Sequence, residues 1–345
     1  MKAFIAEDKN VKVIRSKEYN YDFNKSTGYF ARWGKNVEDD PQFSPFGPEI
    51  LDIEITTKCT GPGGKLCGFC YKSNTPNGKN MSLETFRKIL DKMPKTLTQV
   101  AFGADAQATS NPDLFKMMEY CRTNEHNQVV PNITVADITE DTADILVSLA
   151  GAVAVSRYSN KNFCYDSIKR LTDRGLKQTN IHIMISQETL DQAIETINDY
   201  KTDPRLAKLN AIVFLSLKKK GRGERYNPLT QKQFKSLVDL AFELKVPFGF
   251  DSCSYVKFIE SIKDRPDAKQ LSISAEPCES SAFSSYIDVD SIFHPCSFCG
   301  EDTSFGEGLN VLECKKFSDI WNNEKTKSFR NKLITCGRSC PIYEV

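Results

Sequence analysis

Short apolar segments alternate with amphipathic segments from residue 49 to about residue 250, and this alternation constrains the fold more than any other feature. The segment "EILDIEITT" alternates apolar and polar residues and predicts a strand. The segment "MSLETFRKILDKM" places its apolar residues on one helical face, with Ser82 as a plausible N-cap, and Asn111 is the expected N-cap of the next helix. Expected strands cover 49–57, 97–103, 128–136, 151–156, 180–186 and 209–217, with expected helices at 81–93, 111–121, 140–150, 162–175, 188–200 and 230–244.

Strands that alternate with helices predict parallel βα units. Six units are two fewer than a closed eight-unit barrel needs, so we expect an α/β fold, an open, partial (β/α)6 TIM-like barrel. We place the barrel at 49–265, an N-terminal extension at 1–48 and a small C-terminal domain at 266–345. Residues 246–251 read as an extra strand. Sites on such sheets lie at the carboxyl ends of the strands.

Composition excludes several classes of protein. Lys plus Arg is 46 and Asp plus Glu is 45 among 345 residues, a formal charge of +1. That balance argues against a protein that coats nucleic acid or a membrane surface. We see no apolar run near the ~20 residues that span a bilayer, and no signal-peptide pattern at the start. We therefore expect a cytoplasmic protein with no membrane or nucleic-acid partner.

The chain has twelve cysteines, many for a compartment where disulfides seldom persist. Cys59, Cys67 and Cys70 lie in the loop after the first expected strand, and six others lie in the last fifth of the chain. Clustered cysteines favour metal binding. Structural zinc takes four ligands, whereas three thiols with a vacant fourth position suit a 4Fe–4S cluster with one open iron.

At this loop the sequence resembles the radical S-adenosylmethionine (radical SAM) superfamily. Cys67-Gly68-Phe69-Cys70 matches the second half of the family motif, aromatic residue included, but the gap after Cys59 is seven residues where the family usually has three. The resemblance implies that the three thiolates hold a 4Fe–4S cluster and that the amino and carboxyl groups of SAM bind the open iron. Reductive cleavage of SAM would then give a 5′-deoxyadenosyl radical that abstracts hydrogen from a substrate.

The resemblance also implies SAM-binding residues at strand ends. Phe69 is the motif aromatic. Gly103-Ala104-Asp105 stands where the family has Gly-Gly-Glu, which binds the methionine amine. Ser156 and Ser186 end the fourth and fifth strands, where the family contacts the ribose and carboxylate of SAM. Each serine reads equally well as an ordinary cap or turn residue.

The segment from Cys278 to Cys296 resembles the opening of the twitch and SPASM extensions of radical SAM enzymes. Two further clusters would need eight thiolates, whereas the segment from Cys278 to the end of the sequence has six cysteines. The resemblance therefore implies one auxiliary 4Fe–4S cluster. Its expected ligands are Cys278, Cys296, Cys336 and Cys340. Cys299 and Cys314 would be spare, with Cys299 the nearest alternative ligand. A zinc ribbon built from the same four thiols is the competing interpretation.

The expected function is a radical SAM enzyme that epimerises, crosslinks or oxidises a ribosomally made peptide. The alternatives are a radical SAM dehydrogenase of a small molecule, such as an amino sugar, and a non-enzymatic zinc or iron–sulfur scaffold. Cys253 is a candidate hydrogen-atom donor, although a buried structural thiol is the commoner role. We expect a flavodoxin or ferredoxin-type electron donor. The basic loop 217–228 would contact that donor or an acidic substrate, or would simply be solvated.

Overall fold

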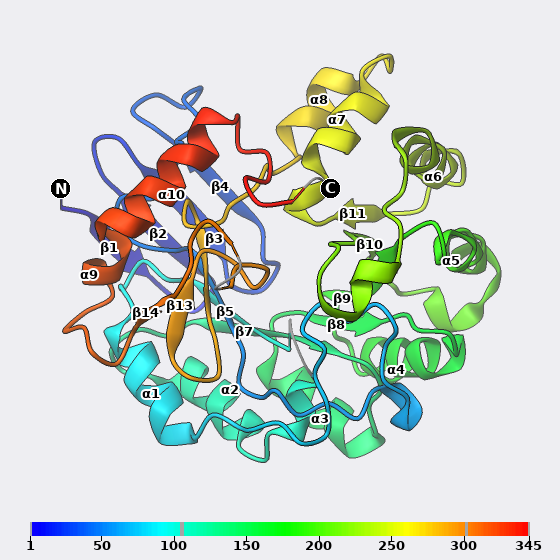
Figure 1. The fold of residues 1–345 in the computed structure, drawn as a ribbon, viewed down its shortest axis with the longest axis horizontal. Coiled ribbons are helices and arrows are strands. Elements are labelled where there is room, and N and C mark those ends of the chain that lie inside the picture. Colours follow the sequence, from blue (N-terminus) through cyan, green and yellow to red (C-terminus); the bar gives the residue numbers. More distant parts are fainter. Residues whose placement is uncertain (1, 104–106, 301–302, 344–345) are drawn as a thin grey trace.

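The computed structural model describes residues 2–103, 107–300 and 303–343. Within these ranges the strands form a four-stranded antiparallel sheet and a ten-stranded sheet of order β11-β10-β9-β8-β7-β6-β5-β12-β13-β14 (Figure 1). The strands are β1 (Phe4–Glu7), β2 (Val11–Arg15), β3 (Asn20–Asn24), β4 (Phe30–Trp33), β5 (Ile50–Ile53), β6 (Gln99–Phe102), β7 (Val130–Val135), β8 (Val153–Ser156), β9 (Thr179–Ile185), β10 (Ala211–Ser216), β11 (Phe248–Phe250), β12 (Ser284–Ile287), β13 (Ile292–His294) and β14 (Leu309–Asn310).

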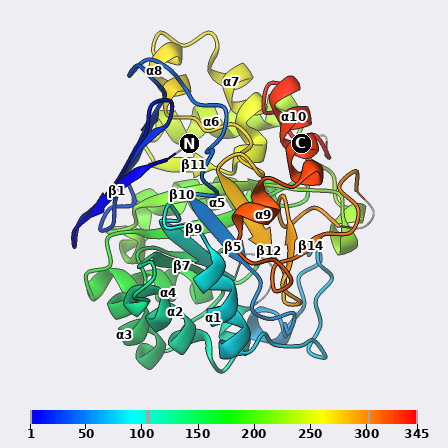
Figure 2. The same cartoon turned by 90° about the vertical axis from the view of Figure 1, so that its left-hand side faces the viewer.

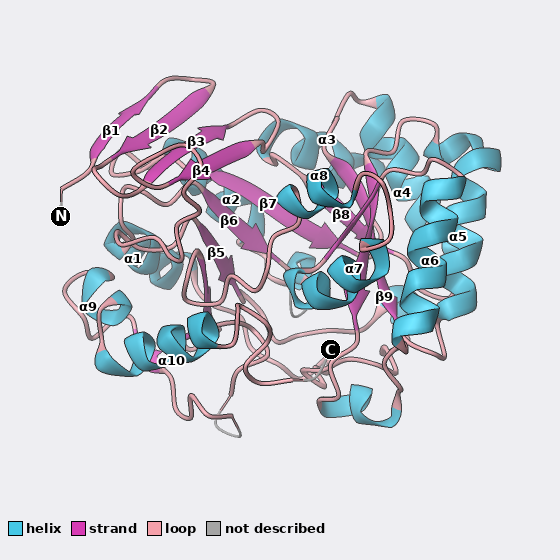
Figure 3. Ribbon diagram, turned by 90° about the horizontal axis from the view of Figure 1, so that it is seen from above, coloured by secondary structure: helices cyan, strands magenta, loops and turns pink. Residues whose placement is uncertain are grey.

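The alternation read from the sequence is present as a mixed α/β fold with a large parallel sheet. Strands β5 to β11 pair in parallel in chain order, and helices α1 to α6 connect them. The helices are α1 (Leu83–Lys92), α2 (Leu114–Thr123), α3 (Glu140–Leu149), α4 (Lys161–Asp173), α5 (Leu190–Thr202), α6 (Gln231–Glu243), α7 (Tyr255–Ile262), α8 (Ala268–Ile273), α9 (Ser318–Trp321) and α10 (Glu324–Thr335). Figure 3 shows α5 and α6 side by side along the outside of the sheet.

The two predicted helix caps had different outcomes. The Ser82 side chain accepts a hydrogen bond from Thr85 N, so the cap of α1 is confirmed. Helix α2 begins at Leu114 with Asp113 at the N-cap, so the prediction that Asn111 caps it is wrong. The Asn111 amide instead donates to the carbonyl oxygens of Ile55 and Met81, at 2.8 and 2.9 Å. These carbonyls flank the cysteine loop, which is therefore held at both ends.

The C-terminal segment joins the large sheet. Strand β12 pairs in parallel with β5, with Tyr286 opposite Asp52, and β13 and β14 continue the sheet antiparallel. Figure 2 shows β5 and β12 side by side, although more than 200 residues separate them in the chain. Strand β5, which leads into the cysteine loop, is thus an internal strand with a partner on each side.

Strands β1–β4 contact the amino end of the large sheet. Lys12 is 1% exposed and donates to Leu97 O at 3.0 Å and to Asn127 Oδ1 at 2.5 Å, just before β6 and β7. Arg32 donates to Glu49, the residue before β5, at 2.9 Å. Burial lowers the pKa of Lys12 to about 8. The small sheet, which lies within the N-terminal extension expected at 1–48, therefore covers the amino ends of β5–β7.

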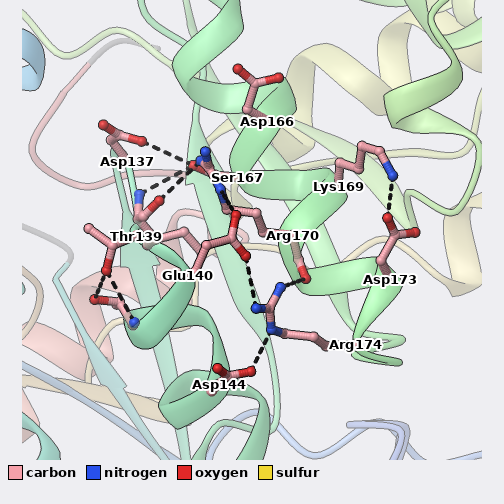
Figure 4. Close-up of polar contacts among 12 residues, drawn as sticks. Asp137, Thr139, Glu140, Asp144, Asp166, Ser167, Lys169, Arg170, Asp173 and Arg174 are labelled. Atoms are coloured by element: carbon pink, nitrogen blue, oxygen red, sulfur yellow. Dashed lines mark hydrogen bonds and ion pairs between the residues drawn. The ribbon is translucent and has the colours of Figure 1, made fainter.

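Ion pairs connect neighbouring helices on the outer surface (Figure 4). Glu140 of α3 accepts from Arg170 and Arg174 of α4, at 2.7 and 2.8 Å, and Arg174 also donates to Asp144 at 2.6 Å. The carboxylates are more than half exposed. Solvent-exposed pairs of this kind contribute little stability, about 0–1 kcal/mol each. None of the helices in the described ranges is long and apolar enough to cross a membrane.

Candidate functional site

A cavity of about 470 Å³ lies against the inner face of the large sheet, the face opposite the packing of helix α1. The alternation of side chains along a strand separates the two faces. Leu51 and Ile53 of β5 pack in the core with Phe86 of α1, whereas Asp52 between them lines the cavity. Strands β5 to β10 all contribute lining residues, and the cysteine loop (residues 59–74) closes one side at the carboxyl ends of the strands.

The cysteine loop brings its three thiols to this cavity. Cys59, Cys67 and Cys70 are free, half-buried thiols, and all three line the cavity. Burial raises the pKa of Cys67 to about 11, and the neighbouring Cys59 and Cys70 raise it as well. Gly61 has a φ of +74°, and a Cβ there would lie 2.0 Å from Lys65 O. The loop can therefore make this turn only with glycine.

The basic loop after β10 holds the cysteine loop in place. Arg222 Nε donates to Cys67 O at 2.9 Å, and Arg222 N donates to Cys70 O at 3.0 Å. A Cβ at Gly221 would lie 2.4 Å from Tyr71 O, so this close approach requires glycine. Part of the basic run thus makes structural contacts with the site, a role that its charge did not indicate.

Aromatic side chains surround the motif residue Phe69. Its ring stacks on Tyr158 at 6.1 Å and meets Tyr226 edge-on at 6.1 Å. The pKa of Tyr158 lies far above its usual range because the phenol is buried beside Cys67. These aromatic rings pack around the residue that precedes Cys70.

The predicted SAM-binding residues have different positions. Gly103 and Ser156 line the cavity, and Gly103 has a φ of +79° where a Cβ would lie 2.5 Å from Thr134 O. Ala104 and Asp105 lie outside the described residues. Ser186 is buried, is not among the residues that line the cavity, and forms a turn in which its N donates to Thr189 Oγ1 at 2.9 Å. Its contacts are those of a turn residue.

Sequence reasoning missed Arg157, the residue after β8. Its side chain is 2% exposed and lines the cavity, and Nη2 donates to Glu195 at 2.6 Å. Within the described chain its Nε and Nη1 have no hydrogen-bond partner. A buried guanidinium with free donors beside a cavity is suited to bind a carboxylate. The signal available in the sequence was an arginine directly after an apolar strand.

The C-terminal cysteines come from separate segments. The sulfur atoms of Cys296 and Cys299 lie 3.8 Å apart. Burial raises the pKa of Cys278 to about 12, and the nearby Cys296 and Cys340 raise it too. Cys336 is exposed, and its sulfur contacts carbonyl oxygens of its own helix end, at 3.2 and 3.3 Å. Cys278, Cys296 and Cys340 are therefore neighbours, whereas Cys336 turns away from them.

The turn between Cys296 and Cys299 connects these thiols to the cavity. Phe298 lines the cavity and contacts Tyr71 of the cysteine loop at 4.3 Å between ring centroids. The ammonium of Lys218 lies 4.7 Å from the Phe298 ring centroid. The contact between Tyr71 and Phe298 thus connects the cysteine loop to the C-terminal cysteines.

Cys253 follows β11 and lies beside a buried ion pair. Lys218 donates to Asp251, and both residues line the cavity, whereas Cys253 is not among the lining residues. Burial raises the pKa of Cys253 strongly, with Lys218 opposing it and Cys278 and Cys340 adding to it. Cys253 therefore lies toward the C-terminal cysteines.

The spacing of the thiols can be compared with that of a single-metal site. Four sulfurs around one zinc lie about 3.8 Å apart, because Zn–S bonds are about 2.3 Å in a tetrahedron. Among the residues that the structure describes, no three His, Cys, Asp or Glu side chains form such a group. Thiolates of a 4Fe–4S cluster bind separate irons and stand further apart.

Comparisons with known proteins give structural likeness only. The chain is similar to a crystal structure of BtrN in complex with AdoMet and 2-DOIA, at 14% identity and a TM-score of 0.42, over 83% of this chain and 87% of that one. It is also similar to the N-terminal domain of a candidate aldolase from Bacteroides vulgatus, at 10% identity and a TM-score of 0.39, with the same coverage. No family model and no curated protein sequence matches the chain.

Proposed function

We propose that this chain is a radical SAM enzyme, with the large sheet forming a partial (β/α)6 barrel and the C-terminal segment a twitch- or SPASM-like region. The observation that carries the proposal is the placement of Cys59, Cys67 and Cys70. All three thiols lie on one loop after β5 and face a cavity at the carboxyl ends of parallel strands. Active sites on sheets of this kind occupy that end.

The residues around the thiols fit the binding of SAM. A 4Fe–4S cluster on the three thiolates would supply the electron that cleaves SAM to methionine and a 5′-deoxyadenosyl radical. Gly103 allows backbone to approach the ligand, and Arg157 has free donors for the SAM carboxylate. Asp105 stays the predicted partner of the methionine amine, and Ser156 that of the ribose. Phe69 and Tyr158 keep water away from the thiols.

The C-terminal thiols fit one auxiliary 4Fe–4S cluster. Cys278, Cys296 and Cys340 are its proposed ligands because they are mutual neighbours. For the fourth ligand we propose Cys299, a neighbour of Cys296, over Cys336, which the sequence favoured but whose sulfur contacts its own helix end. The auxiliary cluster would accept the second electron of a substrate oxidation, and a flavodoxin or ferredoxin-type protein would reduce the first cluster.

The cavity favours a compact substrate. Small-molecule sites measure roughly 300–1,000 Å³, and about 470 Å³ must here hold SAM as well as substrate. A dehydrogenase of a small molecule fits this space better than an enzyme that admits a folded peptide. A peptide could present a single side chain to the cavity, and peptide modification stays the competing prediction.

The proposed function is tested by anaerobic reconstitution. The protein should hold about eight iron and eight sulfide per chain, absorb near 400 nm and form 5′-deoxyadenosine from SAM under dithionite. Zinc content without iron, or no 5′-deoxyadenosine from the fully loaded protein, would overturn it.

A further inference from the structure

The inner face of the large sheet is polar where a parallel sheet is normally apolar. Interiors of parallel barrels are filled by branched aliphatic side chains, and parallel strands read as nearly continuous apolar runs. Here the strands that line the cavity carry polar residues at alternate positions. They are Asp52 on β5, Asn132 and Thr134 on β7, Ser156 on β8, and Asn180 and His182 on β9.

Two of these polar residues are already used by the fold. Asn132 donates to Gln99 Oε1 at 2.8 Å and accepts from Ala152 N at 3.0 Å. Asn180 accepts from Asn210 at 2.8 Å. Both side chains are hydrogen-bonded within the fold and need no ligand.

The side chains of Asp52 and His182, unlike those of Asn132 and Asn180, are not used by the fold. Neither side chain makes a hydrogen bond or an ion pair within the part of the chain that the structure describes. Burial raises the pKa of Asp52 to about 7, and the negative charge of Glu279 adds to the rise. Burial lowers the pKa of His182 to about 4, so the imidazole is neutral at pH 7. A half-buried carboxyl without a partner carries a desolvation cost that a ligand can offset.

Asp52 marks the inner end of the cavity. Register pairs it with Ala101 on β6, which pairs in turn with Asn132 on β7, and these are the lining residues nearest the amino end of their strands. The cysteine loop lies at the opposite, carboxyl end. A molecule that contacts Asp52 therefore occupies the space beneath SAM, on the side toward the amino ends of the strands.

We propose that the inner end of the cavity is a substrate subsite in which Asp52 binds the amino group of a compact, polar molecule and His182 hydrogen-bonds to a second polar group of it. This inference rests on the proposed function, since it assigns the substrate class of the same site. A cationic amine fits because the charges of the other residues at the cavity are balanced. Asp251 balances Lys218, and Glu195 balances Arg157. Those cations lie beside residues at the carboxyl end of the strands, which leaves Asp52 without a counter-charge among the described residues.

The test uses three ligands that share the same cyclohexane ring and differ in charge: cyclohexylamine, cyclohexanol and cyclohexanecarboxylate. Each is titrated into the full-length, reconstituted protein with SAM bound, and binding is followed by saturation-transfer NMR and calorimetry. We expect the amine to bind at least tenfold more tightly than the alcohol, and Asp52→Asn to remove that difference. The proposal is overturned if the three ligands bind equally or if Asp52→Asn binds the amine as the wild type does.

Two further variants separate the subsite from effects on folding. Ala101→Leu fills the inner end without changing Asp52 and should also abolish amine binding. Asp290→Asn makes the same chemical change at an exposed carboxylate paired with Lys79 and should leave amine binding unchanged. Circular dichroism and iron content report folding for each variant, and amine binding by Ala101→Leu at wild-type affinity would overturn the subsite even if Asp52→Asn did not fold.

The outcomes also distinguish the subsite from the proposed function. If the wild-type chain forms no 5′-deoxyadenosine, the proposed function fails whatever the amine titration gives. If it cleaves SAM while Asp52→Asn keeps full affinity for cyclohexylamine, only the subsite is wrong.

Discussion

The two ends of the large sheet are built in opposite ways. At the amino end, charged side chains contact one another: the Arg32 side chain is 3% exposed and contacts Glu49 at 2.9 Å and Glu276 at 2.7 Å, and Tyr19 donates to Glu49 at 2.5 Å. At the carboxyl end and in the cavity, two nitrogens of Arg157 and the Asp52 carboxyl have no hydrogen-bond partner among the described residues, and the three thiols of the cysteine loop form no disulfide. Buried polar groups that are hydrogen-bonded within the protein stabilise the folded structure, whereas polar groups without a protein partner are available to bind a ligand. We expect changes at the amino end to reduce stability and changes at the carboxyl end to reduce function.

The largest expected effect is at the cysteine loop. Replacing Cys59, Cys67 and Cys70 together by Ala should abolish 5′-deoxyadenosine formation and lower iron from about eight to about four per chain. The melting temperature of the apoprotein should change little, because the thiols are half-buried and make no core contacts in the described ranges. Cys314→Ala, a single thiol outside both proposed ligand sets, is the control. Continued SAM cleavage by the triple variant would show that the loop is not the cluster site.

The next largest effect should distinguish Cys299 from Cys336. Cys299→Ala should lose about four iron per chain, whereas Cys336→Ala should keep about eight, because the Cys336 thiol points to its own helix end. Iron and sulfide analysis measures both. Loss of iron from Cys336→Ala with retention by Cys299→Ala would restore the ligand set expected from the sequence.

At the amino end, Arg32→Met should lower the free energy of unfolding by about 3–5 kcal/mol, because it leaves Glu49 buried and unpaired. Urea denaturation measures this. Arg15→Met is the matched control on the same small sheet: its pair with Asp22 is more than a third exposed and should contribute under about 1 kcal/mol. Equal losses from the two variants would contradict the contrast between the two ends of the sheet.

At the carboxyl end, Arg157→Gln should weaken SAM binding by roughly ten- to a hundredfold, since a charge-assisted hydrogen bond contributes about 1.5–3 kcal/mol. Calorimetry on the reconstituted protein measures it. Arg170→Gln removes an arginine of the exposed α4 surface and should leave SAM affinity unchanged. If both variants bind SAM as the wild type does, Arg157 has no contact with the ligand.

The smallest effect concerns stability and pH in the apoprotein. Burial raises the pKa of Asp52 from its ordinary value of 3.8 to about 7, so the folded protein holds a proton that the unfolded chain releases. The contribution of Asp52 to stability is therefore present below pH 4 and is lost as pH rises through 7. The full shift would be worth about 4 kcal/mol, but solvent in the cavity screens the half-buried Asp52 carboxyl, so Asp52→Asn should exceed the wild type by about 1–2 kcal/mol at pH 8 and by little at pH 4.

Thermal melts at the two pH values check this prediction. Glu49 keeps its own pKa of about 7, raised by burial against the effect of Arg32, so part of the pH dependence should persist in the variant. If the difference in melting temperature between Asp52→Asn and the wild type is no larger at pH 8 than at pH 4, Asp52 ionises in the folded protein without loss of stability.

The sequence predicted the parallel sheet and the cysteine loop because both rest on local patterns: strand and helix periods, and three thiols within twelve residues. It missed the small amino-end sheet, whose buried Lys12 and Arg32 resemble surface residues until their partners, far away in the chain, are known. The alternation in "EILDIEITT" predicted a strand but not what its polar positions face. Asp52 faces a cavity, and only the curvature of the sheet decides between cavity and solvent.

The parallel pairing of β12 with β5 has a consequence for biosynthesis. The strand that precedes the cysteine loop acquires its second neighbour only after residue 287 has left the ribosome. At roughly 5–20 residues per second, β5 keeps an open edge for some ten to fifty seconds after its own synthesis. During that interval the edge can pair with another chain, so nascent protein is exposed to aggregation.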